Sequence, residues 1–275
     1  MDYSIRLLSA ASCTEEVHGK SRNMVYLFGT TKEGEAIAVR TPLMMPYFQV
    51  VEPPKDIIEN LGKRDDVEKL EPLDLWVDGE IKKCTKVTVS HPGKVPKIRE
   101  WLKNNDLKLL AADIPFHHRY LNDNDIGGCI RVRGKEIRKE GWSCKVIEVI
   151  EILPSESFES DFKILSFDIE NSIFERTIYC LSYCIKTSSG YIHEETLHGD
   201  EEKLLNDFVK AIKEHDPDII TGYNIDGYDL PLLVERAEVY GIKLAIGRDG
   251  TNLEQRFQRF WQARGRVIVD AFEFT

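Results

Sequence analysis

Apolar residues in the first half of this chain of 275 residues occur in short runs that turn residues separate. The runs are rich in β-branched and aromatic residues, which is the pattern of strands joined by turns. They predict strands at residues 24–29, 36–39, 47–51, 85–90, 107–111, 129–133 and 144–150. Short helices are predicted at residues 56–61, behind Pro96 up to Leu102, and from Pro115 onward. We therefore expect a β-rich first domain with a compact α+β part.

The second half alternates between the strand period and the helix period. Apolar residues at helical spacing predict an amphipathic helix over residues 201–214 and another over residues 229–240, which Gly241 ends. Strands are predicted at residues 163–168, 177–185, 190–197, 218–222 and 266–270. The polar, proline-led segment 153–160 indicates a linker, so the expected domains are residues 1–153 and 161–275. Three strands, a helix, a strand and a helix predict a ribonuclease-H-like α/β sheet in the second domain.

Carboxylates stand at two of the predicted strand ends. Asp168 and Glu170 lie two residues apart, so they share one face of their strand. Asp229 opens the helix that follows a later strand, and we expect it to converge on the first two. Because grouped carboxylates repel each other, divalent cations such as Mg²⁺ or Mn²⁺ are the expected ligands. Asp229 also suits a helix N-cap, and both roles are compatible.

Composition limits the possible functions. With 42% hydrophobic and 31% charged residues, the chain is expected to be soluble, and no apolar run has the length of a membrane span. The N-terminus lacks the pattern of a signal peptide, which predicts a cytoplasmic protein without a membrane partner. The six cysteines form no Cys-x-x-Cys pair, which argues against zinc. The net charge of −10 does not by itself favour nucleic-acid binding, so DNA contact requires basic patches or bound metals.

The carboxylate motifs resemble the first two exonuclease motifs of archaeal family B DNA polymerases. Asp168-x-Glu170 corresponds to the first motif, and Tyr223-Asn224, followed by Tyr228-Asp229, corresponds to the second. The resemblance implies a ribonuclease-H-like 3′–5′ exonuclease domain, with Asp168, Glu170 and Asp229 as catalytic metal ligands. It also implies a two-metal site for Mg²⁺ or Mn²⁺, and contacts from Asn224 and Tyr223 to the terminal nucleotide.

The resemblance extends to the first domain. Residues 46–48, 90–99, 113–116 and 119–121 are similar to segments of the N-terminal domain of that family. In archaeal members these segments line a pocket that captures uracil in the template strand. The implied pocket residues are Pro46, Val95, Ile114, Pro115, Phe116 and Arg119. Ordinary core packing is the alternative interpretation of the same residues.

The third exonuclease motif of the family, Tyr-x-x-x-Asp, is not present. Tyr240 is the only tyrosine after Asp229, and Leu244 stands four residues beyond it. Segments resembling the palm, fingers and thumb are also missing. We therefore expect the N-terminal part of a longer or split polymerase, with little exonuclease activity of its own and no polymerase activity. The exonuclease domain is accordingly expected to be incomplete at its C-terminal end.

The implied function is that of the N-terminal and exonuclease portion of a DNA-directed DNA polymerase that replicates and proofreads DNA. Its expected partners are the single-stranded template, the primer 3′ end, the remaining polymerase domains or a second polypeptide, and a sliding clamp. One alternative is a non-catalytic module that binds single-stranded DNA or uracil and keeps a vestigial nuclease fold. Another is a stand-alone nuclease of the ribonuclease-H type in which Asp270 supplies the missing ligand.

Overall fold

A computed structural model describes residues 1–256 and 260–274. The chain packs into two units, each with its own set of internal contacts. The first unit comprises Met1–Ala11, Tyr26–Arg40 and Ile126–Thr275, and the second comprises Ser12–Val25 and Thr41–Asp125. The sequence-based boundary between residues 153 and 161 does not coincide with this division, and it stays a prediction.

The first unit contains a closed five-stranded barrel in the order β1-β2-β3-β9-β8. Its strands are β1 (Asp2–Val17), β2 (Lys20–Thr30), β3 (Ala36–Arg40), β8 (Cys129–Ile137) and β9 (Lys145–Pro154). β3 and β9 run parallel, whereas β8 pairs antiparallel with both β1 and β9. The predicted strands in these regions are confirmed, but β1 was not among them. Residues 12–17 of β1 and 20–25 of β2 belong to the second unit.

The second unit holds a four-stranded antiparallel sheet in the order β5-β6-β4-β7. Its strands are β4 (Tyr47–Val51), β5 (Val67–Val77), β6 (Glu80–Val89) and β7 (Leu109–Leu110). Its helices are α1 (Lys55–Gly62), η1 (Pro92–Lys94), α2 (Val95–Lys103) and α3 (Phe116–Asp123). Apolar residues of the sheet pack with α1 and α2 in one buried cluster. The predicted helices are confirmed, and β5 is a strand that the sequence did not predict.

The remaining part of the first unit is a five-stranded mixed sheet in the order β12-β11-β10-β13-β16. Its strands are β10 (Ile164–Asn171), β11 (Ile178–Thr187), β12 (Gly190–His198), β13 (Ile219–Gly222) and β16 (Val267–Asp270). β10, β13 and β16 are parallel, and β11 is antiparallel to both of its neighbours. This topology confirms the predicted ribonuclease-H-like α/β sheet.

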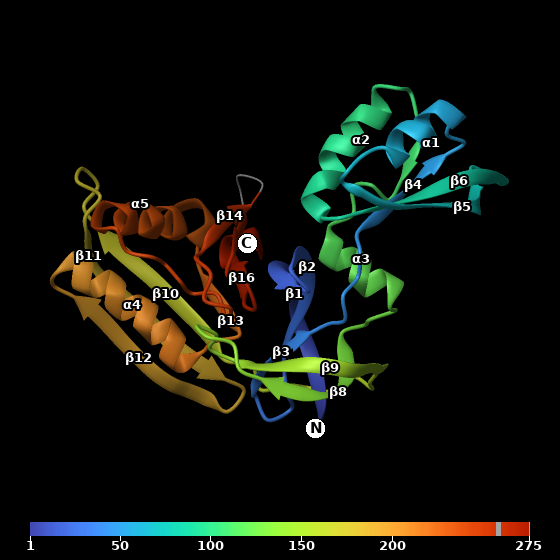
Figure 1. Cartoon of the computed structure of the whole chain (residues 1–275). Helices are drawn as coiled ribbons and strands as arrows, with labels where there is room; N and C mark the ends of the chain where they lie inside the picture. The colour runs from blue at the N-terminus through green and yellow to red at the C-terminus, as the bar shows by residue number, and fades with distance from the viewer. Residues whose placement is uncertain (257–259, 275) are drawn as a thin grey trace. The chain divides into compact units, whose positions relative to one another are not determined.

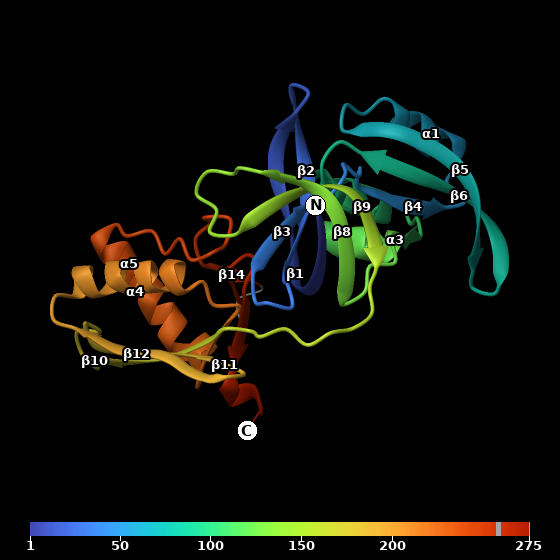
Figure 2. The same ribbon diagram turned by 90° about the horizontal axis from the view of Figure 1, so that it is seen from below.

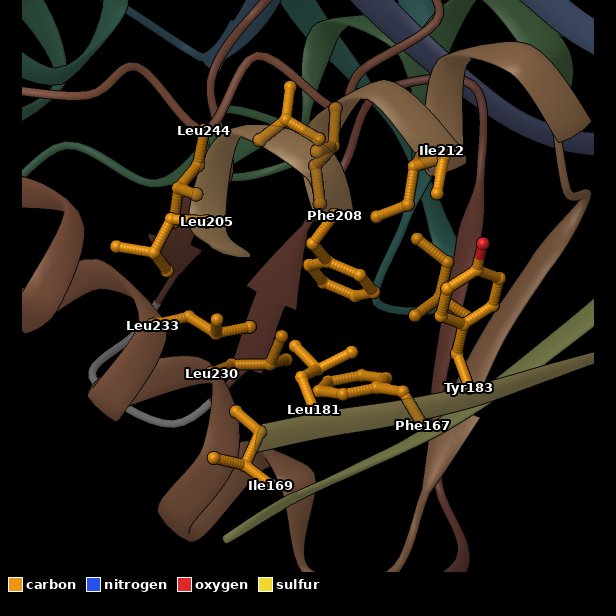
Figure 3. Close-up of a cluster of buried hydrophobic side chains, with 14 of the residues drawn as sticks. Phe167, Ile169, Leu181, Tyr183, Leu205, Phe208, Ile212, Leu230, Leu233 and Leu244 are labelled. Atoms are coloured by element: carbon orange, nitrogen blue, oxygen red, sulfur yellow. The ribbon is translucent and has the colours of Figure 1, made fainter. Parts of the chain in front are cut away.

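Two helices, α4 (Glu201–His215) and α5 (Leu230–Tyr240), cover the same face of this sheet (Figures 1 and 2). Alternate residues of the strands point toward them, as Phe167 and Leu181 do toward Phe208 and Leu230 (Figure 3). Gly241 ends α5 in the left-handed conformation, with φ of 67°, as its position after the last apolar residue predicts. The helices therefore bury one face of the sheet and leave the carboxylate-bearing face of β10 open.

Smaller elements complete the first unit. A π-helical turn, η2 (Ile225–Asp229), precedes α5, and the strands β14 (Glu254–Arg256) and β15 (Phe260–Gln262) pair antiparallel. The 3-10 helix η3 (Ala271–Phe274) follows β16. Within residues 1–256 and 260–274, no helix is both long enough and apolar enough to cross a membrane.

Candidate active site

The central strand β10 carries two of the predicted site residues on its open face. Phe167 and Ile169 are buried under the helices, whereas Asp168 and Glu170 alternate with them and are exposed. This is the arrangement that a period of two requires when one face of a sheet is covered. Asp168 stands opposite Ser182 of β11, and Glu170 stands opposite Cys180.

Asp229 comes from the segment that follows β13, the parallel neighbour of β10. The chain leaves β13 at Gly222, where an added Cβ would lie 2.6 Å from the carbonyl oxygen of Phe167, so only glycine permits this close approach. It then passes through Asn224, which adopts the left-handed conformation with φ of 59°, and through the π-helical turn. Asp229 ends that turn with only 4% of its surface exposed.

The pKa of Asp229 reflects its burial and the charge of neighbouring carboxylates. The pKa of Asp229 is raised to about 6, first by burial and then by the negative charge of Asp168. The charge of Asp270 acts in the same direction, while the backbone amides of Asp229 and Ile169 lower the pKa. A buried carboxylate that a second carboxylate repels is stabilised by an added positive charge.

The two residues predicted to contact a nucleotide lie on the same turn. Tyr223 and Asn224 are both exposed, and the ring of Tyr223 meets that of Phe272 edge-on at a centroid distance of 5.4 Å. An added Cβ at Gly227 would lie 2.6 Å from Oδ1 of Asn224, so the Asn224 side chain folds back over the turn. Tyr228 donates its hydroxyl proton to Oδ1 of Asn171, which ties the turn to the end of β10 at 2.9 Å.

Asp168 and Tyr223 line one open hollow of about 810 Å³ on the uncovered face of the sheet. Strands β10, β11 and β12 supply most of the rest of its surface, which includes Ser166, Ser182, Glu194 and Thr196. The hydroxyls of Ser182 and Thr196 lie 2.9 Å apart and share a hydrogen bond. A polar, open hollow that reaches Asp168 can admit a chain-like substrate to the carboxylates.

The carboxylates form a pair more clearly than a triad. Within the part of the chain that the structure describes, no three His, Cys, Asp or Glu side chains are grouped closely enough to hold one ion. The pair of Asp168 and Asp229 nevertheless fits a divalent cation, because both offer hard oxygen ligands and burial makes their repulsion costly. Glu170 lies on the same face of β10 as Asp168, and its role as a third ligand stays a prediction.

Asp270, which one alternative made a metal ligand, accepts hydrogen bonds from the backbone, and its role as a ligand stays a prediction. Its Oδ1 accepts the N–H groups of Asn224 at 2.7 Å and of Phe272 at 3.0 Å, and its Oδ2 accepts that of Asp226 at 3.0 Å. Its place at the end of β16 is visible in the sequence, but these partners are not. No local signal in the sequence identifies this function of Asp270.

The second unit contains a separate cavity of about 350 Å³. Its lining includes all six residues expected for the uracil pocket: Pro46, Val95, Ile114, Pro115, Phe116 and Arg119. The Arg119 guanidinium lies over the ring of Tyr47 at 4.4 Å and donates to the carbonyl of Ala111 at 3.2 Å, which fixes one wall. The cavity has the size of a small-molecule site and is already formed by packing.

The sheet order, the two helices on one face and the carboxylates at the end of the central strands define a nuclease domain of the ribonuclease-H-like class. Residues 174–274 match the model of the DNA polymerase family B exonuclease domain. Such domains are nucleases that generally need divalent metals. The match includes Asp229 and Asp270 and begins after Glu170.

Relatives of known name extend the similarity to most of the chain. A DNA polymerase of Archaeoglobus fulgidus is 38% identical over an alignment of 250 residues, which covers 84% of this chain and 30% of the relative. A DNA polymerase of Pyrococcus glycovorans is 30% identical over an alignment of 233 residues, which covers 75% of this chain and 25% of the relative.

A solved structure agrees with these relatives. The family B DNA polymerase from the hyperthermophilic archaeon Pyrobaculum calidifontis matches with a TM-score of 0.81 and 28% identity, over 98% of this chain and 36% of that chain. The chain is thus a homologue of archaeal family B DNA polymerases and contains an exonuclease domain of that family. It spans between a quarter and about a third of the length of these relatives.

Proposed function

We propose that this chain works as the N-terminal and 3′–5′ exonuclease portion of a DNA-directed DNA polymerase that replicates and proofreads DNA. The observation that carries the proposal is the buried Asp229 beside Asp168, on the sheet of a family B exonuclease domain. The relatives that bear the name DNA polymerase support the wider activity. The non-catalytic alternative has no such support.

In this proposal Asp168, Glu170 and Asp229 are the catalytic carboxylates and hold Mg²⁺ or Mn²⁺. When bound, a pair of such cations activates a water molecule and stabilises the leaving oxygen of the phosphodiester. Asp168 and Glu170 face the open side of the sheet, so a strand end can reach them, and Glu170 orients the attacking water. Asp229 supplies its carboxylate from a fixed, buried position on the leaving-group side.

Asn224 and Tyr223 are proposed to hold the terminal nucleotide of the strand. The exposed ring of Tyr223 offers a flat apolar face next to the hollow that Asp168 lines, which suits stacking on a base. Asn224 sits on the turn that leads to Asp229, so a hydrogen bond from its side chain places the nucleotide relative to the carboxylates.

The cavity of the second unit is proposed to sense uracil in the template. Its apolar walls suit the face of a pyrimidine, and backbone polar groups at its edge suit the Watson–Crick edge of the base. Selection against thymine then follows from exclusion, since the thymine methyl group needs space that a close-fitting wall denies. We keep the boundary between residues 153 and 161 as the proposed division between this N-terminal function and the exonuclease.

The proposed partners are the single-stranded template and the primer 3′ end. The polymerase domains, in the same or a second polypeptide, and a sliding clamp are proposed to complete the working enzyme, and the proposed compartment is the cytoplasm. The relatives, of which this chain spans about a third, support these partners by their names alone.

The test joins cation binding to hydrolysis. Mn²⁺ binding is measured by water proton relaxation on the wild type, Asp168→Asn and Asp229→Asn. We expect saturable binding by the wild type and a loss of about ten-fold or more in affinity in each variant, because each removes a charged ligand.

Hydrolysis of a 3′-labelled single-stranded DNA with Mn²⁺ is measured on the same three proteins. We expect slow cleavage at most, because the third motif is missing from the sequence, and the variants should show none. Unchanged Mn²⁺ affinity in both variants would contradict the proposed site.

A further inference from the structure

Asp270 is a buried carboxylate at the carboxyl end of β16, with 7% of its surface exposed. In the register of the parallel pair it stands beside Gly222, the last residue of β13. Among the residues that the structure describes, no arginine or lysine forms an ion pair with it. Its oxygens instead accept three backbone N–H groups, two of which belong to the turn after β13.

That turn has the shape of an anion-binding concavity. Asn224 is in the left-handed conformation, with φ of 59° and ψ of 28°, and the π-helical turn follows it directly. When a left-handed residue adjoins a right-handed one, the neighbouring N–H groups converge and attract an anion. Here Asp270 occupies the concavity, because the N–H groups of Asn224 and Asp226 both point to its carboxylate.

Other contacts of the turn depend on the same geometry. The indole N–H of Trp261 donates to the carbonyl of Asp226 at 3.1 Å, and the N–H of Tyr228 donates to the carbonyl of Asn224 at 3.0 Å. Asp229 comes next in the chain and is buried where the charge of Asp168 acts on it. The position of Asp229 is therefore fixed through the turn that Asp270 holds.

We propose that Asp270 is a positioning residue of the nuclease site: its carboxylate clamps the Asn224–Asp226 turn and so sets Asn224 and Asp229 for cation and nucleotide binding. This inference rests on the proposed function, and it replaces the alternative in which Asp270 is itself a ligand. The lone pairs of Oδ1 are directed to two N–H groups and Oδ2 accepts a third, so three of the four acceptor sites of the carboxylate are taken by the backbone.

The informative variant is Asp270→Asn, which keeps the shape but replaces one acceptor oxygen by an N–H₂ donor. Its matched control is Asp218→Asn, another buried aspartate of the same sheet. Asp218 precedes β13 and bonds to the hydroxyl of Thr30, the N–H of Lys163 and the guanidinium of Arg248. Both variants lose buried hydrogen bonds, but only Asp270→Asn alters the turn that carries Asp229.

Two measurements are made on the full chain. In metal-free protein, the amide proton shifts of Asn224 and Asp226 are recorded by NMR, and Mn²⁺ affinity is recorded by water proton relaxation. We expect both amide protons to move upfield in Asp270→Asn only, and its Mn²⁺ affinity to fall about ten-fold, as changes to residues that orient metal ligands do. Asp218→Asn should lower the thermal midpoint and leave the Mn²⁺ affinity unchanged.

The outcomes are distinguishable. Unchanged amide shifts in metal-free Asp270→Asn overturn the clamp, and if its Mn²⁺ affinity still falls, Asp270 is a ligand. Shifted amides with wild-type Mn²⁺ affinity overturn the positioning function. If the wild type binds no Mn²⁺, the proposed nuclease function fails, and the amide shifts then decide whether the clamp exists.

Discussion

The two ends of strand β13 carry similar numbers of aspartates in opposite electrostatic settings. At its start, Asp216 and Asp218 meet the buried guanidinium groups of Arg248 and Arg266, with Arg248 donating to Asp218 at 2.8 Å and Arg266 to Asp216 at 2.8 Å. At its other end, Asp168, Asp229 and Asp270 have no arginine or lysine partner among the described residues.

The difference separates carboxylates that arginines of the same chain neutralise from carboxylates that have no such partner. Where the chain supplies its own cations, the acidic groups are permanently neutralised and link the barrel to the sheet, as the bond from Thr30 to Asp218 shows. Where it supplies none, the pKa of Asp229 rises, and an added positive charge would stabilise its carboxylate. Four predictions test this contrast, beginning with the largest expected effect.

The first prediction breaks the neutralised end. Arg248→Met removes the arginine partner of the buried Asp218, while Asp216 keeps Arg266, and the unpaired Asp218 should lower the free energy of unfolding by about 3–5 kcal/mol. Denaturant titration measures the change. The control Arg176→Met removes a pair with Glu235 in which both side chains are substantially exposed, and it should cost less than about 1 kcal/mol. Equal losses in the two variants would contradict the contrast.

The second prediction fills the other end. Mn²⁺ at about 100 times its dissociation constant should raise the free energy of unfolding of the wild type by about 2.7 kcal/mol, because only the folded chain groups the carboxylates. Thermal unfolding with and without the ion measures this. Asp229→Asn should show little of the gain and Arg176→Met all of it; stabilisation that survives in Asp229→Asn would place the ion elsewhere.

The third prediction uses the pKa of Asp229, which lies at about 6 in the folded chain against an ordinary value of 3.8. The folded state binds this proton more tightly than the unfolded state, so the contribution of Asp229 to stability is greatest below about pH 4 and is lost as pH rises to about 6. The loss should be about 2 kcal/mol in metal-free protein. Urea titrations across this range should show the loss in the wild type and not in Asp229→Asn; parallel curves would refute it.

The fourth prediction concerns the cavity of the second unit, which contrasts with the carboxylate site because packing forms it without added charge. Val95→Phe places a ring in the cavity and should weaken binding of uracil-containing single-stranded DNA about ten-fold, with little change for the thymine-containing strand. Fluorescence anisotropy measures both, and Mg²⁺ should not alter the uracil preference. Val239→Phe, on the exposed side of α5, is the control. Uracil affinity at the wild-type level in Val95→Phe would remove the cavity from the proposal.

The sequence by itself determined most elements and the face on which each candidate residue lies. The helical spacing of Leu204, Leu205 and Phe208 predicts α4, and the alternation along β10 separates Asp168 and Glu170 from the buried Phe167. These features are local. Residues two apart share a face of a strand and residues four apart share a face of a helix, whatever the rest of the chain does. The motif that contains Asn224 and Asp229 is also local, so its resemblance to the second exonuclease motif could be seen in the sequence alone.

Some strands could not be predicted from the sequence, because pairing in a sheet stabilises them. β5 (Val67–Val77) contains Pro72 and four charged residues, a poor strand pattern that is tolerated because β5 lies at the edge of its sheet. β1 (Asp2–Val17) is rich in small and polar residues, and its pairing with β8 in the closed barrel holds it as a strand. Pairing with a distant strand stabilises both segments, and no window of sequence contains that partner.

Only the tertiary structure decided how the charges are used. Thr30 and Asp218 are 188 residues apart, and Asn224 and Asp270 are 46 apart, yet each pair shares a hydrogen bond. Asp218 and Asp270 look alike in the sequence as aspartates next to apolar strands. Folding gives the first an arginine and the second the N–H groups of a turn. The energy of a buried carboxylate depends on the groups within a few ångströms of it, and the fold alone brings those groups together.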